Sequence, residues 1–288
     1  MKILVTGAAG QMGGTVIETL LTKMPAQQIS VLTRKEEKKK EFQSKGFNSF
    51  LGDYVNIASL ERAMEGVDTV LLISSGDQGD RMQEHKNVVD TARRMGVTAI
   101  AYTSRSLKDR ATLTNKLMDE HFATEDYIKE SGLQYNIFRN ALYMEVLPYY
   151  VGKTVFEGGG FVQVAGDGKV AFTFRKDQGE AMGNVLLHEA FENQVYRFTA
   201  SQANSLYDVA AILSELSGKK VTYTPVDVAV YKESMKKQGL PETVVNKIVD
   251  FNIDMKNGQE SVVTKDLEIK LGRKPTTLKE GLKILFKL

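Results

Sequence analysis

The chain opens with a short apolar run that leads directly into three evenly spaced glycines. Ile3 to Val5 is followed by Thr6 and by Gly7, Gly10 and Gly13, after which the residues follow a helical pattern. This order predicts a strand, a tight turn and a helix. Gly7 permits a sharp bend, Gly10 lets backbone approach a phosphate, and Gly13 lets the helix lie close to its strand. The helix N-terminus adds amide donors, so the segment predicts a dinucleotide diphosphate site.

The spacing of these glycines is G-x-x-G-x-x-G rather than the G-x-G-x-x-G of the commonest dehydrogenases. A glycine triplet is also typical of a turn that only needs a tight bend and close helix packing. Its place directly after an N-terminal strand favours dinucleotide binding over that alternative.

Strand-like and helix-like segments alternate along the first half of the chain. The β-rich runs lie at 28–33, 47–51, 69–74, 99–103 and 135–139, and helical patterns separate them at 36–45, 57–64, 82–95 and 119–130. Alternation with short connections predicts a parallel sheet that helices cover on both faces. We therefore expect an α/β protein with a Rossmann-type, doubly wound parallel sheet.

The second half of the chain has a looser pattern. Glycine-rich turns at 158–160 and 166–168 separate short strands, and a helical pattern follows at 176–189. We expect residues 1–149 to form the dinucleotide-binding domain. Residues 150–288 are expected to supply the remaining sheet elements, interleaved with a small C-terminal α/β lobe that binds substrate over the carboxyl ends of the strands.

Composition excludes several classes of protein. The 288 residues contain 38 Lys and Arg against 36 Asp and Glu, a net charge of +2 that favours neither nucleic acid nor an anionic membrane surface as partner. The absence of cysteine excludes disulfides, thiolate catalysis and cysteine-bound metal. No run reaches the ~18 apolar residues of a membrane span, and the N-terminal apolar run is too short for an export signal. We expect a cytoplasmic monomer or homodimer.

The residues after the second predicted strand indicate which dinucleotide binds. At this position a carboxylate pairs with the free ribose hydroxyl of NADH, whereas a cation accepts the 2′-phosphate of NADPH. Arg34 offers a bidentate fork to phosphate, so NADPH is the expected cofactor and NADH a possible one. Alternatively, the charged run 34–40 is only a solvated helix face. The nearby acidic residues Glu36 and Glu37 are compatible with this alternative.

Other strand ends supply further candidates. Asp53 follows the third predicted strand and is placed to reach the adenine amino group, although Gly-Asp is also a common turn pair. Ser74 and Ser75 end the fourth strand, where small side chains leave room beside the nicotinamide ribose. His85 and His188 have no partners at ligand spacing, so no metal site is predicted.

Short motifs spread over the chain form a pattern known from one protein family. They are Thr6-Gly-x-x-Gly-x-x-Gly13, Arg34, Gly52-Asp53-Tyr54, Leu72-Ile-Ser-Ser75, Ile100-Ala-Tyr-Thr-Ser104, His121-x-x-Thr-Glu125 and Phe138-Arg-Asn-Ala-Leu-Tyr143. In this combination the sequence resembles the NmrA-like branch of the atypical short-chain dehydrogenases/reductases. Within that branch it is similar to bacterial NAD(P)H:quinone oxidoreductases and triphenylmethane-dye reductases, over nearly its whole length.

The resemblance implies an NADPH-dependent reductase with a small-molecule acceptor, and it suggests where the cofactor binds. The expected cofactor-binding residues are Thr6, Gly7, Gly10, Gln11, Met12, Gly13, Arg34, Asp53, Ser74, Ser75, Thr103 and the segment from Arg139 to Met144, which contains Asn140, Ala141, Leu142 and Tyr143. Asn140 and Tyr143 are also expected to face the acceptor.

The chain departs from ordinary short-chain dehydrogenases, whose Tyr-x-x-x-Lys pair exchanges a proton with an alcohol or carbonyl. Tyr102 is followed four residues later by Ser106, and Tyr127 by Ser131. Alcohol oxidation and sugar epimerisation are therefore poorly supported. Hydride transfer to an electron-poor quinone or dye needs no such pair, because water can protonate the product.

Three residues are candidates for catalysis. An amide at Asn140 and a phenol at Tyr143 could orient a carbonyl oxygen, although a turn-stabilising Asn and a half-buried Tyr would look the same. His121 begins a predicted helix and could steer or protonate the acceptor, or could equally be a capping or packing histidine.

Two other functions stay open. A non-catalytic, NADP(H)-sensing regulator of the same family is compatible with the missing Tyr-x-x-x-Lys pair. A nucleotide-sugar epimerase-like enzyme is disfavoured by the absence of that pair.

Overall fold

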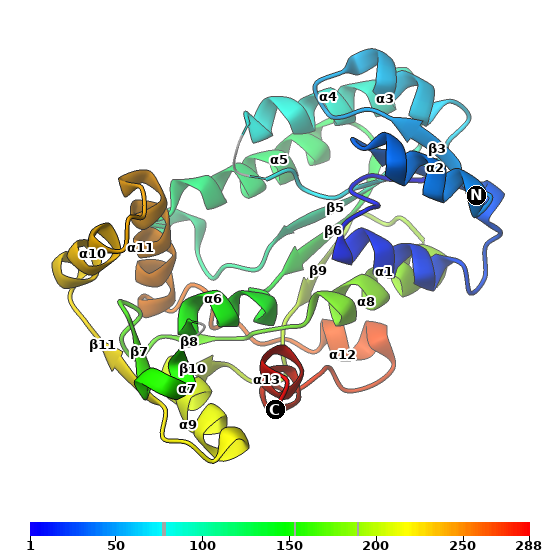
Figure 1. The fold of residues 1–288 in the computed structure, drawn as a ribbon. Coiled ribbons are helices and arrows are strands. Elements are labelled where there is room, and N and C mark those ends of the chain that lie inside the picture. The colour runs from blue at the N-terminus through cyan, green and yellow to red at the C-terminus, as the bar shows by residue number, and fades with distance from the viewer. Residues whose placement is uncertain (77–78, 153, 189) are drawn as a thin grey trace.

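The central feature of the fold is one parallel sheet of seven strands (Figure 1). It belongs to a computed structural model that describes residues 1–76, 79–152, 154–188 and 190–288. The strand order is β3-β2-β1-β4-β5-β6-β9, with every neighbouring pair parallel. The strands are β1 (Ile3–Val5), β2 (Ile29–Thr33), β3 (Asn48–Leu51), β4 (Thr69–Leu72), β5 (Ala99–Arg105), β6 (Gln134–Asn140) and β9 (Gln194–Phe198). This order confirms the predicted doubly wound sheet, whose direction of winding reverses between β1 and β4.

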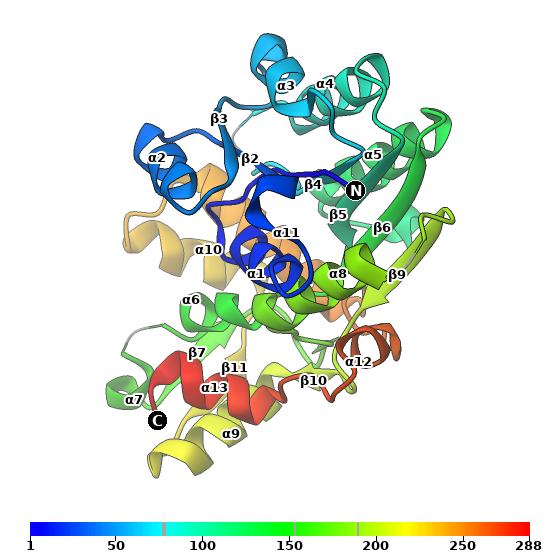
Figure 2. The same ribbon diagram turned by 90° about the vertical axis from the view of Figure 1, so that its right-hand side faces the viewer.

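Helices cover both faces of this sheet. One face carries α1 (Gln11–Leu20), α2 (Glu36–Ser44), α8 (Arg175–His188) and α12 (Asp266–Leu271), and the other carries α3 (Ile57–Met64), α4 (Arg81–Arg94) and α5 (Asp119–Glu130) (Figure 2). Along β1, Ile3 and Val5 belong to the core under the first set and Leu4 to the core under the second, and all three are fully buried. Successive side chains of a strand point to opposite faces, so β1 is covered on both sides.

Helices α1 and α8 pack against each other unusually closely. A Cβ atom on Gly179 would lie 2.8 Å from the Cβ of Thr15, and one on Gly183 would lie 2.5 Å from the Cβ of Thr19. Thr15 and Thr19 of α1 thus face Gly179 and Gly183 of α8 in the same order along the chain, so the two helices run in the same direction. Both N-termini therefore lie at the carboxyl edge of the sheet. Helix α8 corresponds to the predicted helix 176–189, of which Glu189 lies outside the described residues.

A smaller lobe is built from three separate passes of the chain (Figures 1 and 2). Its elements are α6 (Leu147–Val151), α7 (Val155–Gly158), β7 (Gly160–Gln163), β8 (Lys169–Val170), β10 (Asn204–Ser205), α9 (Leu206–Ser217), β11 (Thr222–Pro225), α10 (Val228–Lys237), α11 (Glu242–Lys256) and α13 (Leu278–Phe286). Strand β11 pairs with β7, and β10 with β8. The chain returns to the sheet through α8 and β9 between the first two passes and through α12 between the last two, which interleaves the lobe with the sheet.

No helix is predicted from the sequence at α11, yet the end of this helix ties the lobe to the carboxyl edge of the sheet. The carboxylate of Asp254 accepts hydrogen bonds from the backbone amides of Thr114 (2.7 Å) and Asn115 (3.0 Å). Gln259 Oε1 accepts one from the amide of Asp109 at 2.9 Å. These contacts fix the loop that follows β5. Of the helices described, none has the length and apolarity to cross a lipid bilayer.

The close contact of α1 and α8 predicts that Gly183→Ala destabilises the protein. The new Cβ would overlap Thr19, and overpacking of this kind costs ~1–3 kcal/mol of unfolding free energy. Gly14→Ala is the matched control, because a Cβ there meets nothing within 4 Å and a helical alanine is favoured by up to ~1 kcal/mol. Thermal unfolding followed by circular dichroism should move in opposite directions for the two variants. Equal shifts would contradict the packing argument.

Candidate active site

A cavity of about 320 Å³ opens at the carboxyl edge of the sheet. It lies where the winding reverses between β1 and β4, which is the place where open α/β sheets bind ligands. The residues that line it come from the ends of β1, β4, β5 and β6 and from the starts of α1 and α8. They are Gly7, Gly10, Gln11, Met12, Gly13, Ile73, Ser74, Thr103, Tyr143 and Arg175. Sequence reasoning predicts eight of these ten residues.

The glycine turn forms one wall of the cavity, and its geometry requires glycine. Gly7 has φ of +61°, a backbone conformation that residues with a side chain rarely adopt. The Gly10 amide donates to the Gly7 carbonyl at 3.0 Å. A Cβ on Gly13 would lie 2.4 Å from that carbonyl oxygen. Within the described residues no side chain caps the N-terminus of α1, so its first amides are available, and the turn fits a diphosphate.

Two predicted residues stabilise backbone instead of lining the cavity. Thr6 is fully buried; its Oγ1 donates to the Leu71 carbonyl and accepts from the Ile73 amide, both at 3.0 Å. It thereby ties β1 to β4 beneath the turn. Asp53 Oδ1 accepts the backbone amides two and three residues further on, at 3.0 and 2.9 Å. Asp53 thus has the turn-stabilising role that is the alternative to a contact with the adenine amino group.

Arg34 lies exposed directly after β2, and no ion pair of the described residues includes it. Glu36 and Glu37, the acidic residues next to it, each pair with a lysine in or beside α2 instead of with Arg34. Lys35 Nζ lies 3.9 Å from Glu37 Oε1, and Lys39 Nζ lies 3.5 Å from Glu36 Oε1. The guanidinium of Arg34 is therefore available to a ligand phosphate.

The loop after β4 is positioned by hydrogen bonds from two neighbouring elements. The Ser74 amide donates to Thr103 Oγ1 at 2.8 Å, and both residues line the cavity. The Ser75 amide donates to His85 Nε2 at 3.0 Å. Burial, followed by the charge of Arg81, lowers the pKa of His85 to about 3. The imidazole therefore stays neutral and fixes Ser75 at all ordinary pH values.

The segment after β6 contributes one side chain to the cavity. Tyr143 lines the cavity, and burial raises the pKa of its phenol above the usual value. No hydrogen bond of this hydroxyl to a described residue is present. Asn140 is fully buried, and neither polar atom of its amide has a hydrogen-bond partner in the part of the chain that the structure describes. Ala141 and Leu142 are also buried, outside the cavity lining.

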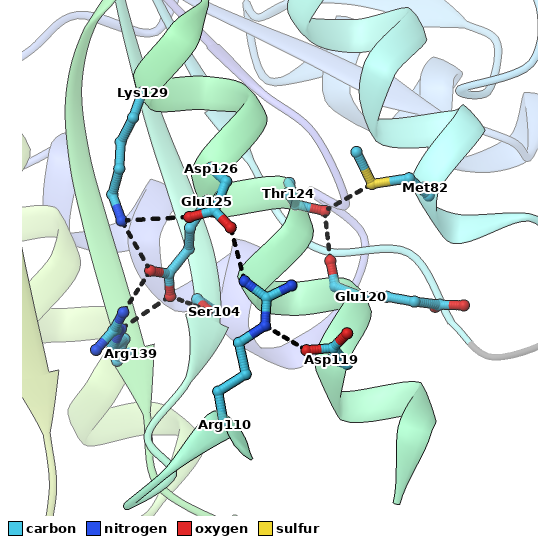
Figure 3. Close-up of polar contacts among 10 residues, drawn as sticks. All are labelled: Met82, Ser104, Arg110, Asp119, Glu120, Thr124, Glu125, Asp126, Lys129 and Arg139. Carbon is cyan, nitrogen blue, oxygen red and sulfur yellow. Dashed lines mark hydrogen bonds and ion pairs between the residues drawn. The ribbon is translucent and has the colours of Figure 1, made fainter. Parts of the chain in front are cut away.

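Arg139, a predicted cofactor contact, lies in a buried ion pair instead of the cavity wall. Its Nε and Nη2 donate to the two carboxylate oxygens of Glu125 at 2.9 and 2.6 Å. Figure 3 shows Ser104 and Lys129 converging on the same carboxylate, which Ser104 Oγ reaches at 2.6 Å. Because Glu125 is fully buried, this pair neutralises the guanidinium and uses its Nε and Nη2 donors. The side chain of Arg139 is thus not brought to the glycine turn.

His121, the predicted acid or steering group, is also placed away from the described lining. Its Nδ1 lies 2.9 Å from the hydroxyl of Tyr102, and its side chain is buried. Burial, followed by the charges of Arg81, Arg105 and His85, holds the pKa of His121 well below its usual value. The ring is therefore neutral at ordinary pH, as expected for the packing alternative.

Sequence reasoning misses Ile73 and Arg175. Arg175 is the first residue of α8; its Nη1 donates to Gln11 Oε1 at 3.1 Å, and its guanidinium lies 4.2 Å from the centre of the Tyr143 ring. An isolated arginine in the middle of the chain carries no local signal of such a role. The i,i+4 glycine pair of α8 is the one available hint, because such a pair indicates a helix that packs very closely.

Comparison with known proteins matches almost the whole chain. The NmrA-like family matches residues 1–282. Quinone oxidoreductase 2 of Escherichia coli is 36% identical over 286 residues, which cover 99% of this chain and 98% of that protein. The crystal structure of this NADPH-dependent enzyme with NADPH aligns with a TM-score of 0.91 and 36% identity over 99% of both chains.

Two further relatives agree with this match. Triphenylmethane reductase of Citrobacter sp. aligns with a TM-score of 0.91 and 34% identity over 100% of both chains. The NAD(P)H azoreductase of Xenophilus azovorans is 27% identical over 247 residues, 85% of this chain and 84% of that protein. The resemblance inferred from the motifs is confirmed: the chain belongs to the NmrA-like family.

Proposed function

We propose that this protein is an NADPH-dependent reductase that transfers hydride directly to a quinone or a similar flat, electron-poor acceptor. One observation carries the proposal: a single cavity joins a glycine turn that fits a diphosphate to a protonated phenol, that of Tyr143. The names of the three relatives support it, since they describe reductases of quinones, triphenylmethane dyes and azo compounds.

The coenzyme is expected to lie along the carboxyl edge of the sheet. The turn at Gly7 to Gly13 and the first amides of α1 bind its diphosphate. Arg34 pairs with the 2′-phosphate, which makes NADPH the preferred coenzyme and leaves NADH a weaker one. Ser74 and Thr103 form the wall where the nicotinamide ribose is expected, and their small side chains leave room for it.

When bound, the reduced coenzyme supplies hydride from its nicotinamide ring. We expect the Tyr143 hydroxyl to donate a hydrogen bond to the acceptor oxygen, and its raised pKa keeps it protonated. Water then protonates the oxyanion of the reduced acceptor. The described cavity lining contains no carboxylate, lysine or histidine that could remove a hydroxyl proton. Asn140 and the neutral His121, the other two residues predicted to be catalytic, lie outside the described lining and are assigned no contact with the acceptor.

The direct test is oxidation of NADPH by a panel of quinones, followed at the absorbance band of the reduced nicotinamide. We expect quinone-dependent oxidation, with a lower KM for NADPH than for NADH. NADPH binding without oxidation by any quinone or dye would instead favour the sensing function. Turnover of a UDP-sugar with no added acceptor would favour the epimerase-like function.

Arg34→Ala tests the coenzyme preference. Loss of a charge-assisted fork should weaken NADPH binding by ~1.5–3 kcal/mol and change NADH binding much less. Fluorescence titration of both coenzymes measures the difference. Lys35→Ala is the matched control, since Lys35 is its exposed neighbour and already pairs with Glu37. Equal losses for NADPH and NADH would contradict the assignment of Arg34 to the 2′-phosphate.

Tyr143→Phe tests the phenol. We expect kcat with a quinone to fall about tenfold or more, with little change in NADPH affinity, because only a hydrogen bond to the acceptor is removed. Because burial raises the Tyr143 pKa, the donor persists below its ionisation, and the wild-type rate should show no loss from this group up to pH ~10. Tyr149→Phe, at a side chain 87% exposed, is the control. An unchanged kcat would remove Tyr143 from the mechanism.

A further inference from the structure

Several buried polar atoms at the carboxyl ends of β5 and β6 have no partner in the protein. They are Arg105 Nε, Ser106 Oγ and both amide atoms of Asn140, none of which has a hydrogen-bond partner among the described residues. Gln178 Oε1, on α8, lacks one there as well, and all four residues are at most 6% exposed. A buried polar atom without a partner is costly and rare, so a group of them indicates a bound water, ion or polar ligand.

The strand register brings three of these residues together. Arg105 on β5 and Asn140 on β6 are neighbours in register, and the Ser106 amide donates to the Asn140 carbonyl at 2.9 Å. Ala101 on β5 and Phe138 on β6 belong to the core under α1 and α8. Because alternate residues of a strand share a face, the side chains of Arg105 and Asn140 point to that same face.

Helix α8 and the segment after α11 cover this group. Gln178 Nε2 donates to the carbonyl of Ala141, the residue after Asn140, at 3.1 Å. Arg105 Nη2 donates to the carboxylate of Glu260, which is buried. The sheet, α8 and the lobe therefore meet around one set of side chains. We call Arg105, Ser106, Asn140 and Gln178 the polar cluster.

The polar cluster adjoins the cavity. Thr103, which lines the cavity, lies on the same face of β5 as Arg105 and about 7 Å before it along the strand. Tyr143, which also lines the cavity, follows Asn140 by three residues. Burial raises the pKa of the Tyr143 phenol, and the charges of Arg105 and Glu260 act on it as well. The phenol is thus within electrostatic reach of the cluster.

The chemistry of the polar cluster favours water as its occupant. Arg105 Nε and Asn140 Nδ2 are donors, whereas Asn140 Oδ1 and Gln178 Oε1 are acceptors. An anion would need donors and a cation acceptors, and Arg105 is already neutralised by Glu260. The described cavity lining does not include these residues, so the acceptor is not expected to touch them. A water molecule both donates and accepts, and a buried one typically makes about three hydrogen bonds.

We propose that the polar cluster binds ordered waters, and that these waters supply the proton that is taken up when a quinone is reduced. The inference rests on the proposed function and deepens it. Addition of hydride leaves a negative charge on a quinone oxygen. The Tyr143 phenol gives its proton to that oxygen, and a water of the cluster returns a proton to the phenolate.

The proton balance then closes on the solvent. The hydroxide that remains at the cluster takes up a proton from the solvent, so each reduced quinone consumes one hydride and one proton. Water is therefore the net proton donor, and the buried phenol is protonated again after each turnover. Asn140 acts in this scheme as a positioning residue, because it holds a water and touches neither the acceptor nor the coenzyme.

A high-resolution crystal structure of the protein without acceptor tests the binding of water. We expect ordered waters within hydrogen-bond distance of the Asn140 amide and of Arg105 Nε. Asn140→Leu should lose them, because leucine fills a similar volume with apolar atoms alone, whereas Asn140→Ala leaves room for a water. Side chains of the cluster that pair directly with one another, without water between them, would overturn the proposal.

Two acceptors that differ in their need for a proton test the proton supply. A quinone takes up hydride and a proton, whereas a cationic triphenylmethane dye takes up hydride alone and becomes neutral. Asn140→Leu should lower kcat for a quinone about tenfold or more, with kcat for the dye within about twofold of wild type. The solvent isotope effect on quinone reduction in heavy water should rise, because proton supply becomes slow. Asn140→Ala should recover most of the quinone rate.

Asn136→Leu is the matched control. Asn136 lies on β6 four residues before Asn140, is fully buried, and has no hydrogen-bond partner for either amide atom in the described part of the chain. Because it is further from the carboxyl edge, its replacement should leave both rates and the isotope effect unchanged. Ser106→Ala is a second test variant that does not depend on the folding of Asn140→Leu. It should raise the isotope effect with a smaller loss of quinone rate.

The possible failures are distinguishable. Equal losses for quinone and dye in Asn140→Leu would make Asn140 a structural residue and overturn the proton supply. An unchanged solvent isotope effect in both Asn140→Leu and Ser106→Ala would overturn it too. Failure of the wild type to oxidise NADPH with any quinone or dye would overturn the proposed function instead, and the crystal structure would still decide whether the cluster binds water.

Discussion

The structure depends on the close approach of Gly13 to the carbonyl of Gly7, where a Cβ would come within 2.4 Å of the oxygen. This approach lets α1 lie directly on the turn and aims its free amides at the cavity. Helix α1 in turn determines where α8 lies, through Thr15 and Thr19 against two glycines of α8. One contact in the first thirteen residues therefore determines the position of Arg175, more than 160 residues later in the chain.

Much of the fold is predictable because its signals are local. The predicted helices 57–64 and 119–130 match α3 and α5 to the residue, since their apolar spacing and their end signals lie within each segment. Helix α11 is missed for the opposite reason. Its buried face includes the polar residues Asn252 and Asp254. Asp254 is stabilised by backbone amides of a loop that lies about 140 positions earlier, so no local pattern reveals it.

The same distinction applies to the site. The glycine turn can be predicted from the sequence because the backbone conformation that it requires is one that glycine readily adopts. The fates of Arg139 and Arg175 depend on tertiary neighbours. Glu125 draws Arg139 into a buried ion pair, whereas Gln11, 164 positions away, meets Arg175 at the cavity. Both residues are arginines close to predicted strand or helix ends, so sequence alone has no means to tell which charge is neutralised and which remains available to a ligand.

The resulting distribution of charge bears on the chemistry. Carboxylates neutralise Arg81, Arg105 and Arg139 close to the sheet edge, and burial keeps His121 and Tyr143 uncharged. The positive charge that remains lies where an anionic coenzyme is expected, while the rest of the described lining is neutral. Such a cavity suits an uncharged acceptor and a hydride donor held by its phosphates. It is poorly suited to remove a hydroxyl proton, because that step needs a base that titrates near neutral pH.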